Sequence, residues 1–571
     1  MHKLFFILLV VVVTGCQTTR DNAPEVDIQS APEPLAALPQ VPLTEDLLAQ
    51  ILTAEIAVRK GQYMQAVDQL LISAQTSRDP RLAAKAAYWS LQSELFEKAK
   101  FAAQLWLDIL ISQPGNDLSN PRVVLAISFI ELNEPDQALP VLLKAIEESS
   151  DQGIYKRIAS EMSRLKNSNG VIGVYQKLIE QTDDQENANL GLAILSARLN
   201  DFELSKDSID KVLEVNPGNE DAALIKISYL YETQNEKDVM DFAENFLQEN
   251  KQAHQFRMEY ARYLSANAHA QEAIKQFKRV AANDVQQVQE ARLNIIALAM
   301  QEENFKLADK NLLALLDTDP TNNRLIYFRC QVQRELGNYS NARELCNEIS
   351  LGEFYFPAQM ELANVLANDD QLEAAITHLD SVPVSGSDEQ IQIYLRKQQL
   401  LYQDEQIERS VTILNSGLKK YPDNTSLLYA RGLVLSELGK VQEHERDMRK
   451  LIQLDPDNAH AYNALGYTLT DLTTRYDEAL ELIQKAVELN PDDAYILDSL
   501  GWVYFKLNDL EQARVHLEQA FDLSGDAEIA AHLGELYWTL GDKSRAKSIW
   551  RKAIKDTPDN KVLNKTLERF L

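Results

Sequence analysis

Histidines and cysteines are the residues of this chain best suited to metal binding or covalent chemistry, and they are few and scattered. None of the eight histidines forms an HExxH motif or another close ligand pair. The sequence also lacks a CxxC pair, a Walker loop, a G-x-S-x-G turn and a dinucleotide-binding glycine fingerprint. We therefore expect no catalytic residue, no metal site and no cofactor, and we predict that the protein is not an enzyme.

Two of the three cysteines are Cys330 and Cys346, which lie 16 residues apart. In the repeat register described below, they fall on the two helices of one repeat. An oxidising compartment would allow such a pair to form a disulfide. Each cysteine also fits an ordinary small core position, so the sequence leaves both interpretations open.

The third cysteine, Cys16, closes an apolar run over residues 4–13. That run is shorter than the roughly 20 residues needed to cross a bilayer, and it matches the apolar segment of a secretory signal peptide. Residues 13–16, Val-Thr-Gly-Cys, resemble the bacterial lipobox. The resemblance implies that residues 1–15 are removed as a signal peptide and that Cys16 carries the acyl chains of a lipoprotein.

Residues 16–42 are rich in proline, alanine and polar side chains and show no helical period. We interpret them as a lipidated, flexible tether. Several acyl chains give stable anchoring without a spanning helix. Gln17 stands where an aspartate would favour inner-membrane retention, so the lipoprotein resemblance implies the periplasmic face of a Gram-negative outer membrane.

The composition narrows the classes of partner. The formal charge is −29 over 571 residues, which disfavours nucleic acid, because phosphate contacts need a basic surface. It equally disfavours broad adhesion of the chain to anionic lipid headgroups. Glycine and proline are sparse (19 and 18 residues), so we expect a helical protein that reaches the membrane only through its lipid.

A repeated phrase with one small residue runs through the chain from about residue 45. The small position recurs every 33 to 35 residues, with one step of 39. A period of 34 is the signature of the tetratricopeptide repeat (TPR), a helix–turn–helix unit. The repeated positions are Ala66, Ala99, Ala138, Val171, Ser205, Val239, Ala273, Ala308, Ala342, Ala375, Ser410, His444, Ala479, Ala513 and Ala546.

The pattern predicts an all-α solenoid, a right-handed TPR superhelix of about fifteen repeats over residues 43–560. Residues 561–571 are expected to form a C-terminal capping helix. Residues 150–200 fit the repeat worst, so we expect irregular repeats there. No single repeat buries its apolar face alone, and neighbours must stack.

First helices of such a solenoid line its concave face. Counting from Gly466, Gly501 and Gly534, the residues one after, three before and four after each glycine point toward that groove. An aromatic groove with polar anchors suits protein or peptide capture, although the same rings could pack between repeats. The predicted partner-binding residues are His460, Asn463, Tyr467, Asp498, Trp502, Phe505, Glu535 and Trp538.

Residues 461–571, together with the lipobox and the chain length, are similar to a proteobacterial family of TPR lipoproteins. The family includes the outer-membrane partner of the periplasmic carboxyl-terminal processing protease. The resemblance implies a non-enzymatic adaptor that binds the protease and brings in its substrates, among them peptidoglycan (murein) hydrolases. No small-molecule substrate is implied.

Two other functions remain open from the sequence. The chain could be a component of an envelope assembly machine for outer-membrane protein insertion or polysaccharide export, or an activator of a peptidoglycan synthase. TPR lipoproteins of the assembly machines usually have fewer repeats. Synthase activators tend to carry an additional domain, whereas here the repeat pattern continues to the C-terminus.

Overall fold

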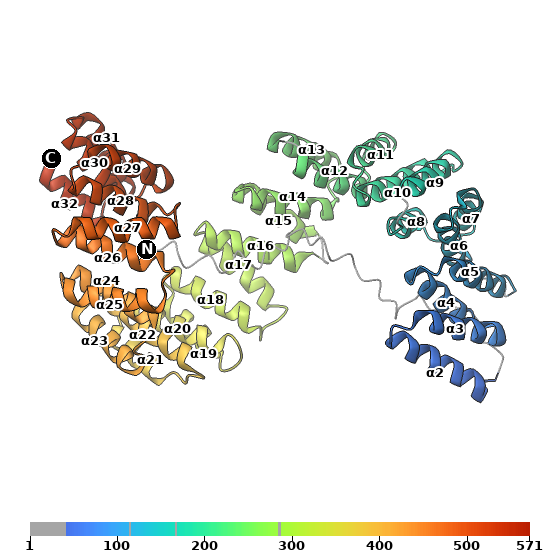
Figure 1. The fold of residues 1–571 in the computed structure, drawn as a ribbon, viewed down its shortest axis with the longest axis horizontal. Helices are drawn as coiled ribbons and strands as arrows, with labels where there is room; N and C mark the ends of the chain where they lie inside the picture. The colour runs from blue at the N-terminus through green and yellow to red at the C-terminus, as the bar shows by residue number, and fades with distance from the viewer. Residues whose placement is uncertain (1–41, 113–115, 166–167, 234, 284–286) are drawn as a thin grey trace. The chain divides into compact units, whose positions relative to one another are not determined.

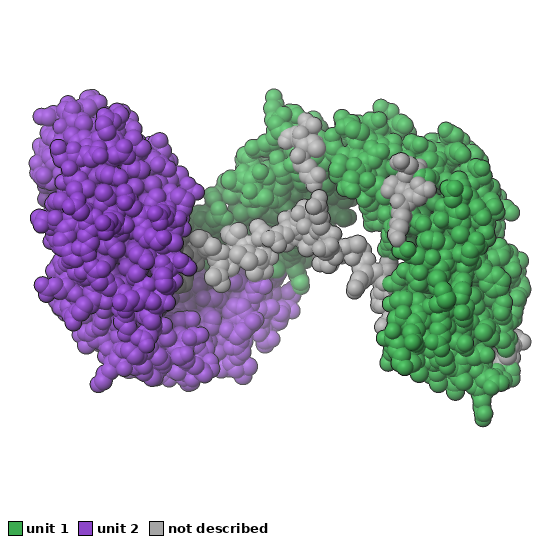
Figure 2. Space-filling model, viewed as in Figure 1, with its two compact units in different colours: residues 1–311 green, residues 312–571 purple. Residues whose placement is uncertain are grey.

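A computed structural model describes residues 42–112, 116–165, 168–233, 235–283 and 287–571. These residues form 31 helices and no strand. The protein is an all-α TPR solenoid, which confirms the predicted fold class. The chain divides into two compact units, residues 1–311 (unit 1) and 312–571 (unit 2), coloured separately in Figure 2.

In unit 1, most helices pack against the helix that precedes or follows them in the chain (Figure 1). The helices are α2 (Glu45–Arg59), α3 (Tyr63–Ser77), α4 (Pro80–Gln92), α5 (Phe96–Ile111), α6 (Ser119–Glu131), α7 (Pro135–Glu147), α8 (Ile154–Met162), α9 (Ser168–Glu180), α10 (Gln185–Arg198), α11 (Phe202–Val215), α12 (Glu220–Thr233), α13 (Glu236–Glu249), α14 (His254–Ala266), α15 (Ala270–Asn283) and α16 (Val288–Gln301).

Helix α17 (Phe305–Leu316) spans the division, and unit 2 continues the same alternation. Its helices are α18 (Asn323–Glu335), α19 (Tyr339–Glu348), α20 (Tyr355–Asn368), α21 (Leu372–Ser381), α22 (Ser387–Gln403), α23 (Ile407–Lys420), α24 (Thr425–Glu437), α25 (Val441–Leu454), α26 (Ala459–Leu472), α27 (Tyr476–Leu489), α28 (Ala494–Lys506), α29 (Leu510–Ser524), α30 (Ala527–Thr539), α31 (Lys543–Asp556) and α32 (Lys561–Phe570).

Thirty helices form fifteen consecutive pairs, from α2/α3 to α30/α31, and α32 follows the last pair. The turn inside a pair needs a residue with positive φ, which glycine adopts without strain and asparagine tolerates. Gly337 (φ 74°), Gly541 (φ 91°) and Asn508 (φ 63°) occupy this position. The Gly/Asn phrase in the sequence is therefore the turn between the two helices of a repeat.

The small residue of the repeat lies at the contact between the paired helices. All fifteen repeated positions are buried. Even the one large member, His444, is fully enclosed, and its Nδ1 lies 2.8 Å from the Gly432 carbonyl oxygen. Gly432 on the facing helix makes room for Met448, because a Cβ there would lie 2.2 Å from Met448 Cε.

Residues 150–200 depart from the regular pairing. Helix α8 has only nine residues, and it packs against α10, while α9 contacts α7 and α10. The Tyr175 hydroxyl fills the space beside Gly191 and donates to the Tyr155 carbonyl oxygen at 2.9 Å. In this segment the glycine contact is therefore made with α10, the first helix of the following pair.

Asparagine and aspartate begin many of the helices, often two or three residues after a proline that cannot continue the preceding helix. The Asn458 side chain accepts from the Ala461 N–H at 3.1 Å after Pro456. The Asp493 carboxylate accepts from the Tyr495 N–H at 2.9 Å after Pro491. These caps fix where each repeat begins.

The structure joins Cys330 of α18 to Cys346 of α19 in a disulfide bond, with their Cα atoms 5.7 Å apart. Cys16, the predicted signal peptide (1–15) and the predicted tether as far as residue 41 lie outside the described residues. Within the described ranges, no helix has the length and apolar composition required to cross a bilayer.

Candidate protein-docking site

The eight residues predicted to line the groove lie on the first helices of three successive repeats. His460, Asn463 and Tyr467 belong to α26; Asp498, Trp502 and Phe505 belong to α28; and Glu535 and Trp538 belong to α30. Helix α28 contacts both α26 and α30. The three helices therefore form one continuous face, within unit 2.

Burial divides these eight residues into two groups. Asp498 and Trp502 are 4% exposed and Glu535 is 8% exposed. His460 is exposed, and the remaining four residues are half-buried. A partner can therefore reach His460, Asn463, Tyr467, Phe505 and Trp538 directly, whereas the three buried residues contribute by holding the helices together.

A buried ion pair connects two of the repeats. His532 of α30 is 5% exposed, and its Nδ1 lies 2.9 and 3.0 Å from the two carboxylate oxygens of Asp498. Burial alone would lower the pKa of His532, but the charge and hydrogen bond of Asp498, with the charge of Glu528, raise it above its ordinary value. The pair thus favours the imidazolium form.

Aromatic rings enclose this pair. The Trp502 ring stacks on His532 with centroids 4.1 Å apart and on Phe505 at 5.0 Å, and Lys506 Nζ lies 4.4 Å from the Trp502 centroid. A cation over the face of an indole ring is attracted by the π electrons of the ring. Trp502 therefore stabilises both the imidazolium of His532 and the ammonium of Lys506. Trp502 therefore packs between adjacent repeats.

The third repeat joins through Tyr467 of α26, whose hydroxyl donates to Glu528 Oε1 at 3.0 Å. Burial, with the nearby carboxylates, raises the pKa of Tyr467 well above its usual range. Burial also raises the pKa of Glu528, although His532 and Tyr467 act in the opposite direction. We name Tyr467, Asp498, Trp502, Glu528 and His532 the histidine cluster.

The histidine cluster supports the docking face, and no nucleophilic side chain is bonded to its histidine among the described residues. Among the described residues, no serine or cysteine side chain is hydrogen-bonded to His532, and no group of three or more His, Cys, Asp or Glu could hold a metal ion. The cluster links α26, α28 and α30 at a fixed spacing, which presents Tyr467 and Phe505 as neighbouring contact points.

Sequence reasoning missed His532 and Glu528, although one signal was available. Asp498 and His532 are 34 residues apart, which is close to one repeat period and places them on adjacent first helices. Glu535 and Arg569 repeat the arrangement, with Arg569 Nη1 2.9 Å from Glu535 Oε1. Opposite charges one period apart therefore mark contacts between repeats.

Aromatic residues of α30, α31 and α32 close the C-terminal end of the site. The Trp538 ring lies 5.8 Å from Trp550 and 5.5 Å from Phe570, measured between centroids. Lys543 Nζ lies 4.7 Å from the Trp538 centroid. Trp538 is therefore held by its neighbours, while one part of it stays accessible.

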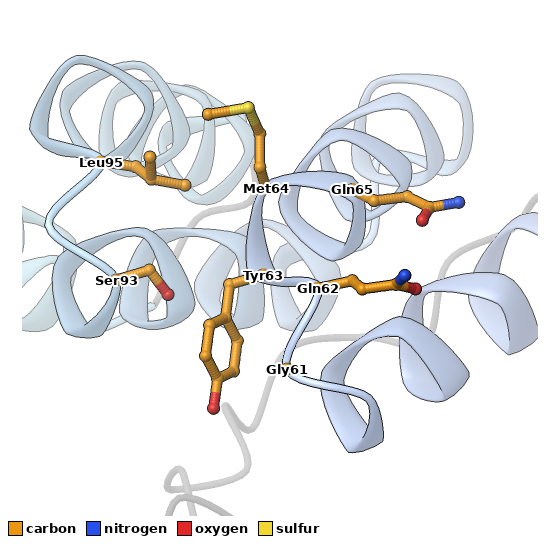
Figure 3. A pocket seen from close by; sticks show the side chains of 7 residues that line it. All are labelled: Gly61, Gln62, Tyr63, Met64, Gln65, Ser93 and Leu95. Atoms are coloured by element: carbon orange, nitrogen blue, oxygen red, sulfur yellow. The ribbon is translucent and has the colours of Figure 1, made fainter.

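A separate hollow of about 410 Å³ lies in unit 1, shown in Figure 3. It is shallow and open, and none of the predicted docking residues contributes to it. Tyr63 in this hollow stacks on Trp89 with centroids 5.4 Å apart. The lining residues are Gly61, Gln62, Tyr63, Met64, Gln65, Ser93 and Leu95.

We expect the histidine cluster to make the stability of unit 2 depend on pH. The folded pKa of His532 is raised, so Asp498 stabilises fully below pH 6.5, the ordinary histidine pKa, and this contribution is lost as the pH rises through the folded pKa. Asp498→Asn should cost about 3–5 kcal/mol below that pH, since a buried charge loses its partner.

The comparison is urea unfolding of both proteins at pH 5.5 and pH 9, with exposed Asp477→Asn of α27 as the control. The destabilisation by Asp498→Asn should be clearly smaller at pH 9, where the imidazole is neutral. Equal destabilisation at the two pH values would show that the pair is not an ion pair.

Comparison with known proteins agrees with this architecture. Family profiles for the tetratricopeptide repeat match residues 425–458, 457–526 and 527–560. The TPR repeat-containing protein PA4667 of Pseudomonas aeruginosa is 36% identical over 188 residues, which is 33% of this chain and 32% of that protein. The match thus spans about a third of the relative's length, and it supports a relation to proteobacterial TPR proteins.

Two solved TPR structures are among those similar to parts of this chain. The TPR protein TTC0263 of Thermus thermophilus is 25% identical, covering 31% of this chain and 97% of that chain with a TM-score of 0.29. A TPR protein of Parabacteroides merdae is 18% identical, covering 49% and 98% of the two chains with a TM-score of 0.32. At these TM-scores, neither structure adds to the argument about the site.

Proposed function

We propose that this chain is a lipid-anchored adaptor that binds a periplasmic carboxyl-terminal processing protease and recruits peptidoglycan hydrolases to it for proteolysis. TPR solenoids act as protein-interaction scaffolds. The observation that carries the proposal is the face of α26, α28 and α30, where half-buried Tyr467, Phe505 and Trp538 lie beside the buried Asp498, Trp502 and His532. Aromatic anchors on a fixed support are typical of protein-binding hot spots.

The finer identity of the partners rests on the resemblance of residues 461–571 to the protease-partner lipoproteins. The match to the Pseudomonas protein supports a proteobacterial TPR relation, and its name mentions only the repeat. A long solenoid offers separate surfaces for enzyme and substrate. Holding both raises their effective concentration without any chemistry by the scaffold itself.

The location belongs to the same proposal. Acylation of Cys16 would hold the protein at the periplasmic face of the outer membrane, where peptidoglycan hydrolases act. The tether of residues 16–42 would let the repeats reach partners away from the lipid surface. This part rests on the sequence alone, since those residues precede α2.

Affinity capture from detergent-solubilised envelopes tests the proposal. The full-length chain should recover a serine protease together with murein hydrolases, and adding it to the purified protease should speed hydrolase cleavage. His460→Ala with Phe505→Ala should weaken protease or hydrolase binding about tenfold, the equivalent of 1.4 kcal/mol.

The matched control is Phe202→Ala, which removes a 45% exposed ring of α11 in unit 1. It should leave capture unchanged. Recovery of neither protease nor hydrolases by the wild-type chain would contradict the proposal, and stable co-purification with a β-barrel assembly complex would replace it.

A further inference from the structure

The last two helices reverse the charge of the chain. Residues 542–571 hold nine basic and four acidic residues, a balance of +5 in a chain of −29, so the preceding 541 residues carry −34. Helix α31 alone has six basic residues and a single acid, Asp556. The acidic part of the sequence is therefore followed by a short segment in which basic residues are in excess.

The basic side chains of α31 form a row on its outer face. Lys547, Arg551 and Lys555 follow one another at intervals of four residues, which places them on one side of the helix. The opposite side of the helix is buried through Ala546, Trp550 and Ala553. Arg551 and Lys555 are exposed, and Lys547 is half-buried.

This row is not neutralised within the protein. Among the described residues, Arg551, Lys552 and Lys555 form no ion pair, whereas the second helices before α31 pair their cations: Lys485 Nζ lies 3.0 Å from Glu488 and Arg514 Nη2 lies 2.8 Å from Glu511. Like charges four residues apart weakly destabilise a helix. A row of cations that stays unpaired despite this loss of helix stability is typical of a binding surface.

The geometry favours a polypeptide as the occupant. A step of four residues along a helix is about 6 Å, and two residues of an extended chain span about 6.6 Å. Carboxylates at alternate positions of an extended segment therefore meet successive cations of the row.

A membrane fits this surface less well. Leu563 of α32 is fully buried, and Val562, Leu567 and Phe570 pack against the same core, so the apolar face of the last helix is already used. Membrane-surface helices need such a face free to enter the lipid. A long nucleic acid is disfavoured by the charge of −34 on the remainder of the chain.

We infer that the outer face of α31 is a docking site for an extended acidic segment of a client protein, with client carboxylates paired to Lys547, Arg551 and Lys555. This inference rests on the proposed role as a docking scaffold and adds the chemistry of one client contact. It places that contact on the second helix of the last pair. The row meets the first-helix face at Lys547, whose Nζ lies 5.7 Å from the centroid of the Trp538 ring.

Fluorescence anisotropy of a labelled twelve-residue peptide with alternating Glu and Ser tests the inference, using the full-length protein in detergent. The wild type should bind this peptide, and binding should weaken as salt is raised. The same peptide with Gln in place of Glu should not bind. Lys547→Glu, Arg551→Glu and Lys555→Glu together should weaken binding at least tenfold.

The matched control is Lys206→Glu, Lys211→Glu and Lys306→Glu, which changes the net charge equally on exposed positions of α11 and α17. It should bind as the wild type does. Lys547→Gln, Arg551→Gln and Lys555→Gln should also weaken binding, and thermal melting of every variant checks that unit 2 is folded.

Three results would overturn the inference. They are no binding of the Glu peptide by the wild type, equal loss in the control triple, or row-dependent binding only to phosphatidylglycerol vesicles or to a single-stranded oligonucleotide. If the chain captures the protease but does not bind the Glu peptide, the α31 docking site is wrong and the proposed function is unaffected. If the chain binds the Glu peptide but captures no protease, the proposed function is wrong and the α31 docking site is supported.

Discussion

Replacing Gly534 by alanine is expected to destabilise unit 2 by about 1–3 kcal/mol, because the added methyl group would overpack the contact with Trp550. A Cβ on Gly534 would lie 2.0 Å from Trp550 Nε1 and 2.4 Å from Cε2. Trp550 is fully buried and donates to the Ala531 carbonyl oxygen at 3.3 Å, so the indole cannot move aside cheaply. Urea unfolding measures the loss.

The control is Gly173→Ala in α9, where a Cβ meets nothing within 4 Å. That change should be neutral or stabilise by up to about 1 kcal/mol, since alanine is the better helix former. Combining Gly534→Ala with Trp550→Leu should cost less than the sum of the two single changes, because the clash is then gone. Strict additivity would show that the two residues do not share one contact.

The repeat architecture was predictable because one physical constraint recurs in every repeat. Two helices that cross closely need a small side chain at the crossing, and the turn before it needs positive φ. The small position at the crossing is the stricter of the two, since Glu94, Glu303 and Glu405 also adopt positive φ in such turns. The period of 34 was therefore visible without structural information. Even the exception was informative, because His444 is matched by Gly432 on the facing helix.

The same register placed Cys330 and Cys346 on the paired helices of one repeat, where a disulfide was one of two interpretations. The register could not decide whether they bond, since two small core residues would satisfy it equally. Their Cα separation of 5.7 Å depends on the local approach of α18 and α19. Periodicity defines which positions face each other but not the distance between them.

The burial of individual side chains on the docking face was less predictable, for a related reason. Tyr467, Trp502 and Glu535 each follow the glycine of a first helix, and the period treats them as equivalent. In the structure Tyr467 is half-buried, whereas Trp502 and Glu535 are buried. The difference arises from the neighbouring repeat: His532 stacks on Trp502, and Arg569 bonds Glu535. Burial in a solenoid thus depends on which residues of the next repeat contact a given position.

Net charge illustrates the same limit at a larger scale. A value of −29 is the net charge of the whole chain, and it disfavours polyanion partners for most of it. It conceals the row of Lys547, Arg551 and Lys555, because the charge of −34 on the first 541 residues is much larger than the charge of +5 on the last thirty. Local charge has to be counted helix by helix on a solenoid, where each repeat contacts only its neighbours.

Truncating Trp502 to alanine should cost about 3–5 kcal/mol, the usual loss for a large buried aromatic side chain. The ring is 4% exposed and stacks on His532 at 4.1 Å and on Phe505 at 5.0 Å. Its removal leaves a cavity beside a buried imidazolium and takes away the aromatic face that stabilises that cation. Hydrogen exchange should accelerate in α28 and α30, while α4 of unit 1 stays protected.

Two further variants separate packing from partner contact at this face. Trp502→Phe should cost much less than alanine, because the indole N–H makes no hydrogen bond among the described residues. Phe505→Ala should weaken capture of the partner with a smaller stability loss, because that ring is half-buried. If Trp502→Ala instead abolished capture and changed the free energy of unfolding by less than about 1 kcal/mol, Trp502 would be a contact residue, and the buried cluster would not support the docking face.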